Sequence, residues 1–470
     1  MNDDSSTATV AAELRTAVAA LRPGDRLPSS RALMARHQVS PVTVSRAIAL
    51  LSAEGLVVSR PGAGTYVAER ARVGARGPAD LAYAWQTVPL ADRTVDARGV
   101  LALLSPPPDG VIALSGGYLA PELQPTQALA TAAARAVRRP DAWERPPLYG
   151  LRGLREWFAR TAGGDVSAAD VTVTGGGQAA VTLALRALLP PGAPLLVESP
   201  TYPGALDSAR AAGLRPVPVP VDEDGLRTDL LAEAFAATGA RAVYCQPTFH
   251  NPTGAVLSPD RRVHVLDVAR AAGAFVIEDD FARHLGIDPP PPSLISADSE
   301  GRVVHISSLT KATAPSVRVA AVSARGPAAE RIRATQLVDS FFVARPLQEA
   351  ALELVGSPAW PRHLRAVGEA LRRRRDVLVS ALAAHGLRPA LVPRGGLHLW
   401  TALPPGTDDS AFAEAALRAG VLVSAGRRYF PAEPAGPRVR LSYGSAAGEV
   451  ELADGTARLA RLLGPGLEHG

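Results

Sequence analysis

Lys311 is the only lysine in this chain, although lysine and arginine together number 50. A lysine amine can lose its proton and condense with an aldehyde, whereas an arginine guanidinium stays charged and cannot. In a chain that otherwise takes its positive charge from arginine, this single amine predicts covalent chemistry. The alternative is a surface lysine that compositional drift left in place.

The neighbours of Lys311 favour the chemical interpretation. Two hydroxyls, Ser308 and Thr310, precede it, and Arg318 follows seven residues later. Hydroxyls and a bidentate guanidinium near one amine suit a phosphate monoester. Residues 303–306 are apolar enough to form a short buried strand that enters the motif. An aldehyde that carries a phosphate and is held by a lysine is pyridoxal phosphate, and we expect that cofactor.

The bulk composition restricts the class of protein. A length of 470 residues suffices for two or three domains, and no apolar run reaches membrane-spanning length. Residues 1–12 are acidic and rich in small side chains, a pattern that argues against a secretory signal. The single cysteine, Cys245, excludes an internal disulfide and fits a reducing compartment. We therefore expect a soluble cytoplasmic protein.

The N-terminal part has the order of elements of a winged helix-turn-helix. Helical patterns cover residues 13–21, 31–37 and 41–54, with Ser40 at the N-cap of the third and Pro41 at its first position. Two short strands, 56–60 and 64–68, then flank a Pro-Gly-Ala turn. Six arginines face only two acids between residues 22 and 67, an excess that suits phosphate contacts. The third helix would read the major groove with Ser40, Val42, Thr43 and Arg46.

The stretch LPSSRALMARHQVSPVTVSRAIALLSAEGLVVSRPGAGTYVA, residues 27–68, closely resembles the DNA-binding domain of GntR-type bacterial repressors. The resemblance implies double-stranded DNA as a partner. It implies DNA contacts by Arg31, Thr43, Arg46, Arg60 and Gly62, to which the helix pattern adds Ser40. A small domain that makes only protein contacts is the alternative. We place this domain at residues 1–68 and a linker at 69–110, whose second half, 81–104, should contact the following domain.

From residue 111 onward helical and strand patterns alternate, which predicts an α/β domain with a mostly parallel sheet. A strand at 171–174 runs into Gly175-Gly176-Gly177-Gln178 and then a helix at 179–189. Such a turn is an anion site, because free amides and the helix dipole point at it. A glycine turn of this kind is by itself more often structural than ligand-binding. The presence of Lys311, Ser308 and Arg318 elsewhere in the chain favours the anion site, because these residues could converge with it.

Three further polar positions follow predicted strands. Tyr202 could stack on a flat ring or pack in the core, and Asn251 could donate to a ring hydroxyl. The apolar strand 275–280 ends in Glu278, Asp279 and Asp280, which are costly to bury without partners. A protonated pyridine nitrogen is such a partner, because a carboxylate keeps that ring cationic.

The order GGGQ, SPTYPG, HNPTG, EDD and SLTK, with an arginine seven residues after the lysine, resembles fold-type I aminotransferases over residues 111–450. The resemblance assigns the phosphate to Gly177, Gln178, Ser308, Thr310 and Arg318. It makes Lys311 the Schiff-base lysine, stacks Tyr202 on the ring, and sets Asn251 at the 3′-oxygen and Asp279 at the pyridine nitrogen. Tyr149 would reach the phosphate of a neighbouring subunit. Arg440 would bind an effector carboxylate, with a surface ion pair as its alternative. No metal is implied.

One position departs from the aminotransferase pattern. The family keeps a tyrosine two or three residues after the pyridine aspartate, where this chain has Phe281 and Ala282. Loss of that phenol should alter the protonation of the Schiff base and leave Asn251 as the main partner of the 3′-oxygen. The departure therefore disfavours efficient transamination more than it disfavours cofactor binding.

A winged helix placed ahead of an aminotransferase-like domain resembles the MocR-type regulators of the GntR superfamily. The resemblance implies a homodimeric transcription factor that binds pyridoxal phosphate and senses an amino compound or the cofactor itself. Two alternatives stay open. One is a working aminotransferase with a DNA-binding appendage, and the other is a regulator whose large domain serves only to dimerise.

Overall fold

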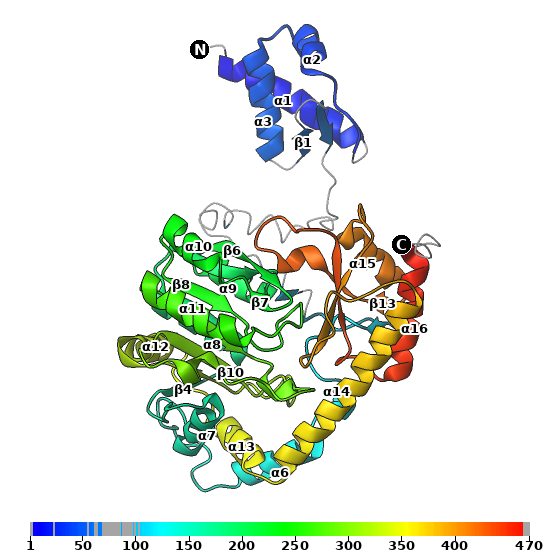
Figure 1. Cartoon of the computed structure of the whole chain (residues 1–470). Coiled ribbons are helices and arrows are strands. Elements are labelled where there is room, and N and C mark those ends of the chain that lie inside the picture. Colours follow the sequence, from blue (N-terminus) through cyan, green and yellow to red (C-terminus); the bar gives the residue numbers. More distant parts are fainter. Residues whose placement is uncertain are drawn as a thin grey trace. The chain divides into compact units, whose positions relative to one another are not determined.

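The chain forms two compact units, Met1–Arg93 and Thr94–Gly470, in the computed structural model. The structure describes residues 3–21, 24–53, 56–60, 64–67, 86, 97, 100, 101 and 104–463. Figure 1 follows the chain from the N-terminal unit into the large unit. Within the described residues no helix is both long and apolar enough to cross a membrane.

The N-terminal unit is a winged helix-turn-helix, as predicted. Its elements are α1 (Asp3–Ala20), α2 (Ser30–His37), α3 (Pro41–Ala53), β1 (Val57–Arg60) and β2 (Gly64–Val67), with the two strands antiparallel. The Ser40 hydroxyl accepts a hydrogen bond from the Thr43 amide at 3.2 Å, which confirms the predicted cap of α3. Leu14, Val44 and Leu51 are among the buried residues that hold the three helices together. Helix α1 begins well before the predicted residue 13.

The large unit is built around an eight-stranded sheet in the order β4-β11-β10-β9-β8-β5-β6-β7. Neighbours from β10 to β6 are parallel, which confirms the predicted sheet type, while β11 and β7 run antiparallel. The strands are β4 (Val171–Thr174), β5 (Pro194–Ser199), β6 (Arg215–Asp222), β7 (Gly225–Leu226), β8 (Ala242–Cys245), β9 (Phe275–Asp280), β10 (Val303–Ser308) and β11 (Ala320–Ser323).

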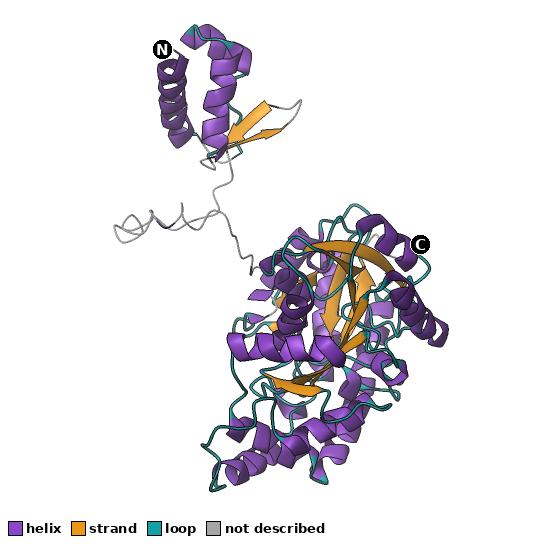
Figure 2. Ribbon diagram, turned by 90° about the vertical axis from the view of Figure 1, so that its left-hand side faces the viewer, coloured by secondary structure: helices purple, strands orange, loops and turns teal. Residues whose placement is uncertain are grey.

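Helices cover both faces of this sheet, as Figure 2 shows for the large unit. Alternate strand residues divide between the faces, so that Tyr244 and Ile277 join one apolar core and Val243 and Val276 join the other. The first core includes α8 (Gly177–Leu188), α9 (Pro203–Ala211) and α12 (Gly326–Asp339), and the second includes α10 (Leu231–Thr238) and α11 (Pro259–Ala272). Because both faces of the sheet are covered there, the buried strands β8 and β11 are nearly continuous apolar runs.

The remaining elements surround a third apolar core. The helices are α6 (Thr126–Val137), α7 (Arg152–Ala162), α13 (Arg345–Val355), α14 (Ala359–Ala384), α15 (Asp409–Arg418) and α16 (Glu449–Leu463). A small antiparallel sheet has the order β12 (His398–Ala402), β15 (Arg438–Ser442) and β14 (Ser424–Ala425), and β13 (Val421–Leu422) pairs with β3 (Ile112–Ala113). The pairing of β3 with β13 ties the start of the large unit to its C-terminal part.

Candidate cofactor and effector site

A cavity of about 400 Å³ lies where the C-terminal ends of the parallel strands meet the small sheet. Every predicted cofactor and effector residue except Tyr149 lines it: Gly177, Gln178, Tyr202, Asn251, Asp279, Ser308, Thr310, Lys311, Arg318 and Arg440. Residues from 177 to 440 thus converge on one chamber. Open α/β sheets commonly bind ligands outside the carboxyl ends of their strands.

Lys311 follows β10 and is held at the cavity wall by the segment after β3. Its Nζ donates to the Gly117 carbonyl at 2.7 Å and lies 3.8 Å from the centre of the Tyr118 ring. Burial, together with the positive charges of Arg440 and Arg318, lowers the pKa of the Lys311 amine to about 7. A large fraction of this amine is therefore uncharged near neutral pH, the form that can react with an aldehyde.

An anion-binding corner lies beside Lys311. The Arg318 guanidinium makes no hydrogen bond or ion pair with the described residues. It lies against Gly176, where a Cβ would come within 2.5 Å of the Arg318 Nη2 and where φ is +96°. The free amides at the start of α8 and the Ser308 hydroxyl complete the corner. The Thr310 hydroxyl instead donates to the Val317 carbonyl at 2.7 Å, which closes the turn before Arg318.

The side chain of Gln178 has a different task from the one its motif implies. Its Nε2 donates to the Gly204 carbonyl at 2.9 Å, and its Oε1 accepts from the Tyr202 hydroxyl at 2.9 Å. Only the main-chain amide of Gln178 is therefore placed to contact a phosphate. The side chain fixes Tyr202, the ring predicted to stack on the cofactor.

Asp279 lines the cavity from the end of β9 and is supported from the neighbouring strand. Its Oδ2 accepts from the Tyr244 hydroxyl at 2.6 Å and from the Gln246 Nε2 at 3.1 Å. Burial raises the pKa of the Asp279 carboxyl to about 6, although both hydrogen bonds oppose that rise. A cationic partner would stabilise the ionised form, and a protonated pyridine nitrogen is one.

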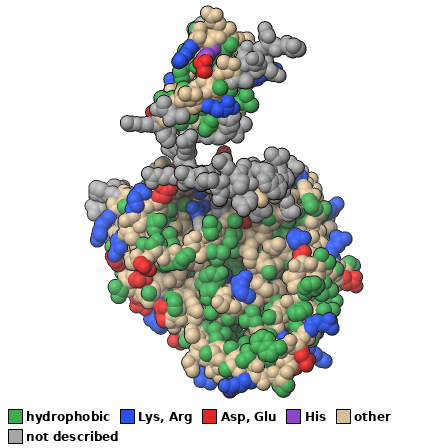
Figure 3. Space-filling view, turned by 180° about the vertical axis from the view of Figure 1, so that it is seen from behind, with side chains coloured by type: hydrophobic (Ala, Val, Ile, Leu, Met, Phe, Trp, Pro, Cys, Tyr) green, Lys and Arg blue, Asp and Glu red, His purple; other side chains and the backbone are tan. Residues whose placement is uncertain are grey.

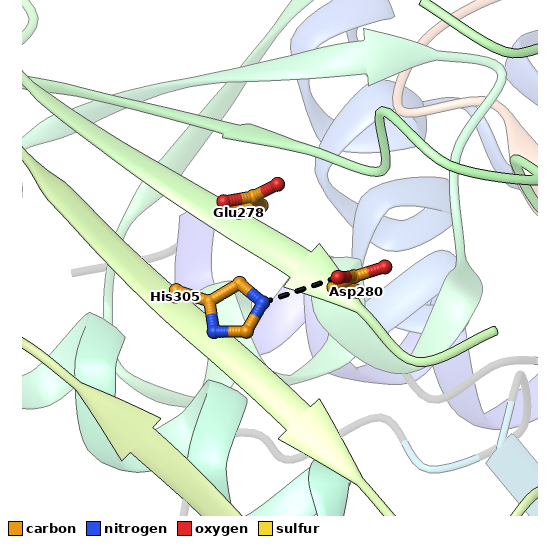
Figure 4. Close-up of side chains that lie close together, drawn as sticks. All are labelled: Glu278, Asp280 and His305. Atoms are coloured by element: carbon orange, nitrogen blue, oxygen red, sulfur yellow. Dashed lines mark hydrogen bonds and ion pairs between the residues drawn. The ribbon is translucent and has the colours of Figure 1, made fainter. Parts of the chain in front are cut away.

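The two acids that flank Asp279 point to the other face of the sheet, where Figure 4 shows them beside His305 of β10. Glu278 accepts from the amides of Leu294 and Ile295 at 2.8 and 3.1 Å. Asp280 pairs with Arg283 and with the His305 Nε2. Glu278, Asp280 and His305 are close enough together to bind a cation. Each acid already has hydrogen-bond or ion-pair partners among the described residues, so we interpret the group as a structural network. These residues fix the end of β9 and thereby the position of Asp279.

Arg440 of β15 is almost fully buried and forms no ion pair with any described acid. Its guanidinium donates to the Asn251 Oδ1 at 3.0 Å and to the Ser115 carbonyl, and it lies near the His398 Nε2 at 3.2 Å. Among the residues that the structure describes, the Arg440 Nε has no hydrogen-bond partner. Because an unpaired buried charge is costly, this guanidinium is suited to an anionic ligand. It is not the surface ion pair considered as an alternative.

Phe281 and Ala282, the two residues that depart from the aminotransferase pattern, lie in different surroundings. Phe281 lines the cavity without a hydroxyl, and Ala282 is buried in the core of the large unit. Asn251 uses its oxygen for Arg440, so its amide hydrogens stay available for a 3′-oxygen. Tyr149 lies outside the cavity, and its ring stacks 4.6 Å from the Arg333 Cζ. Its predicted contact with a neighbouring subunit stays a prediction.

In the N-terminal unit the exposed face of α3 carries Val42, Ser45, Arg46, Ala49 and Leu50. Ser40 is exposed, but Thr43 is only 2% exposed and its hydroxyl lies 2.8 Å from that of Ser40. The Thr43 hydroxyl therefore helps to cap α3, and the predicted contact of Thr43 with DNA stays a prediction. The side chains of Arg31 and Arg60, and all of Gly62, lie outside the described residues.

Comparison with known proteins matches both units. Residues 110–455 match the aminotransferase class I and II family, and residues 6–67 match the gntR family of bacterial regulatory proteins. The HTH-type transcriptional regulator TauR of Rhodobacter capsulatus is 30% identical over 94% of this chain and 93% of its own length. The chain is a MocR-type regulator of the GntR family. Its predicted fold, its DNA partner and its regulatory class are thereby confirmed.

Two further relatives extend the match. The HTH-type transcriptional regulator YdfD of Bacillus subtilis is 28% identical over 94% of the regulator and 92% of its own chain. The crystal structure of the α-aminoadipate aminotransferase LysN from Thermus thermophilus, complexed with N-(5′-phosphopyridoxyl)-L-leucine, has a TM-score of 0.74. LysN is 29% identical, and the match covers 81% of the regulator and 98% of LysN. The aminotransferase fold makes pyridoxal phosphate the cofactor, as predicted.

Several residues of the site escaped the sequence analysis. Gly117 and Tyr118 contact Lys311, Tyr244 supports Asp279, and Val100 and Leu104 form part of the cavity wall. The pair of glycines before Tyr118 was the one local signal, because it permits close approach of the main chain. The others stand in ordinary apolar stretches whose spatial neighbours only the fold reveals.

The lowered pKa of Lys311 predicts how cofactor capture depends on pH. A depressed lysine pKa means that the uncharged amine predominates above about pH 7. When pyridoxal phosphate is added to cofactor-free regulator, the rate of the absorbance change should rise through pH 7 and then level off. A rate that keeps rising toward the ordinary lysine pKa of 10.5 would show that burial does not shift this group.

Proposed function

We propose that the regulator holds pyridoxal phosphate on Lys311, senses an amino compound through Arg440, and changes its affinity for operator DNA in response. The observation that carries this proposal is the buried guanidinium of Arg440, which shares one cavity with Lys311 and has no acidic partner among the described residues. An amine and a carboxylate on one small molecule would meet these two groups together. A domain that serves only to dimerise would have no use for them.

The residues present fit the cofactor. Arg318, Ser308 and the amides that begin α8 would hold its phosphate, Asp279 its ring nitrogen and Asn251 its 3′-oxygen. When bound, the cofactor supplies an aldehyde carbon that captures primary amines and a ring that withdraws electrons. Arg440 orients the ligand by its carboxylate, and Tyr118 and Tyr202 exclude water from the amine.

We propose a homodimer, supported by an apolar surface on the large unit. Figure 3 shows hydrophobic side chains gathered on one face of that unit. Near α6 and α13, Trp143 is 80% exposed and Phe341 is 68% exposed. The ion pair between Arg345 and Asp141 ties the two segments that carry them together. A patch of this kind marks a protein interface, and Tyr149 on the same loop as Trp143 would then face the second subunit.

The proposal includes the organisation of the chain. The gntR match ends at residue 67 and the aminotransferase match begins at 110, which supports a linker at 69–110. The C-terminal end of that linker enters the compact large unit, which begins at Thr94. A DNA-binding regulator with a single buried cysteine belongs in the cytoplasm.

Sensing is favoured over turnover because Phe281 stands in the cavity where a catalytic phenol would serve. An effector only has to occupy the site and bias one arrangement of the protein over another. The test is to screen amino donors for a shift in cofactor absorbance and for a shift in operator affinity. Turnover with a 2-oxo acid at about 1 s⁻¹ or faster, without any effect on DNA binding, would identify an aminotransferase instead.

The DNA interface has its own prediction. Arg46 lies on the exposed face of α3, and replacing it with alanine should weaken specific operator binding by ~1–3 kcal/mol if it reads a base edge. Fluorescence anisotropy with operator and unrelated DNA measures the effect. Arg15→Ala, which removes the same charge from the exposed side of α1, is the matched control. Equal losses for both variants would show that Arg46 contributes only general electrostatic attraction.

A further inference from the structure

Two apolar residues near the start of the large unit form part of the wall of the ligand cavity. Val100 and Leu104 both line it, four residues apart on one face of a helical turn. The Leu101 amide bonds to the Ala97 carbonyl at 2.8 Å and the Ser105 amide to the Leu101 carbonyl at 2.9 Å, which defines that turn. The Val100 amide donates to the Asp207 Oδ2 on α9 at 3.2 Å. Leu101 faces away from the cavity and is 63% exposed.

The charged groups of the cavity all have a place in the proposed function. Among its described lining residues these are Asp279, Lys311, Arg318 and Arg440. Asp279 faces the ring nitrogen, Arg318 the phosphate, and Arg440 one carboxylate, while Lys311 holds the cofactor. Burial lowers the pKa of His398 well below its usual value, so that imidazole is neutral. No described lining residue is left to pair with a charged side chain on the ligand.

The three amide side chains of the described lining each hydrogen-bond another residue of the site. Gln178 holds Tyr202 and Gly204, Gln246 holds Asp279, and Asn251 holds Arg440. Much of the remaining lining is apolar and is formed by Val100, Leu104, Val181, Phe281 and Pro315, together with the Tyr118 ring. A charged group against such a surface would lose its hydration without compensation.

We propose that the effector is an amino acid with a single carboxylate and an apolar side chain, which packs on Val100 and Leu104. This inference rests on the proposed function and names the class of ligand that it senses. The contact also gives the ligand side chain a route toward the DNA-binding unit along the chain, because Val100 and Leu104 belong to the first part of the large unit, which follows the N-terminal unit in sequence. Side chains that fill the wall differently would bias that segment differently.

The test uses full-length regulator loaded with pyridoxal phosphate and the probes L-leucine, L-alanine, L-glutamate and L-lysine. Dissociation constants come from the change in cofactor absorbance, and operator affinity is measured at saturation with each probe. L-leucine should bind at least about tenfold more tightly than L-glutamate or L-lysine, the size of effect that an apolar pocket provides. It should also bind more tightly than L-alanine, which has the same charged groups but little apolar surface.

Two variants in the same helical turn test whether the cavity wall determines the preference for apolar ligand side chains. Leu104→Arg adds a cation to the cavity wall and should shift the leucine-to-glutamate ratio toward glutamate by about tenfold or more. Leu101→Arg makes the same change on the exposed side and should leave the ratio within about twofold. Both positions are more than half exposed, so neither change removes a buried core side chain.

The outcomes separate this inference from the proposed function. If amino acids bind and alter operator affinity without preference among side chains, this inference is wrong and the sensor proposal stands. Equal effects of Leu101→Arg and Leu104→Arg would also overturn it. If no probe changes either the absorbance or the DNA affinity, the sensor proposal fails, and the inference fails with it.

Discussion

Replacing Lys311 with alanine is expected to abolish covalent retention of pyridoxal phosphate by the regulator. The chain has no second lysine to take its place, and its arginines cannot condense with an aldehyde. Borohydride treatment of the loaded wild-type protein should fix the cofactor permanently, and mass spectrometry should find it on the peptide that contains Lys311. The variant should release all of its cofactor on denaturation after the same treatment.

Lys311→Arg serves as the matched control, because it keeps a positive charge beside Gly117 and Tyr118 but removes the reactive amine. Both variants should still bind the cofactor without a covalent bond, since Arg318, Ser308 and Asp279 remain. Cofactor fixed by borohydride to either variant would show that the attachment site lies elsewhere, for example at the N-terminal amine.

Replacing Arg440 with glutamine is expected to weaken binding of an amino-acid effector at least about 30-fold, since loss of one partner of a buried charged pair costs about 2–5 kcal/mol. The effector carboxylate would then face only the Asn251 amide and neutral His398. Titrating the cofactor absorbance with L-leucine measures the loss. The same substitution should raise the pKa of Lys311, because Arg440 is among the charges that lower it.

Arg438→Gln is the control on the same strand. Arg438 belongs to β15 as Arg440 does, but it is partly exposed and is not among the described residues of the cavity wall. Its replacement should leave effector binding and operator binding within about twofold of wild type. If the two variants behave alike, or if Arg440→Gln retains full affinity, Arg440 does not anchor the carboxylate.

The sequence alone determined those features that depend on interactions between residues close together in the chain. The Ser40 cap and Pro41 start of α3 and the strand β4 followed by the glycine turn of α8 appear where the sequence predicts them. Each depends on groups within a few residues of one another, such as a hydroxyl and the amide three positions later. The cofactor-binding segments could also be identified from the sequence, because their order along the chain does not depend on the fold.

Only the tertiary structure decided what surrounds those residues. The contacts of Lys311 with Gly117, of Arg440 with Asn251 and of Val100 with Asp207 each join residues more than a hundred positions apart. Thr43 turned inward although its type suits DNA, because packing of α3 against its own domain set which side is exposed. Neither the amino-acid composition nor the spacing of residues along the chain predicts which distant residues come into contact. These contacts arise when the sheet and its connecting loops bring distant segments together, and burial then removes water as the competing partner of every polar group.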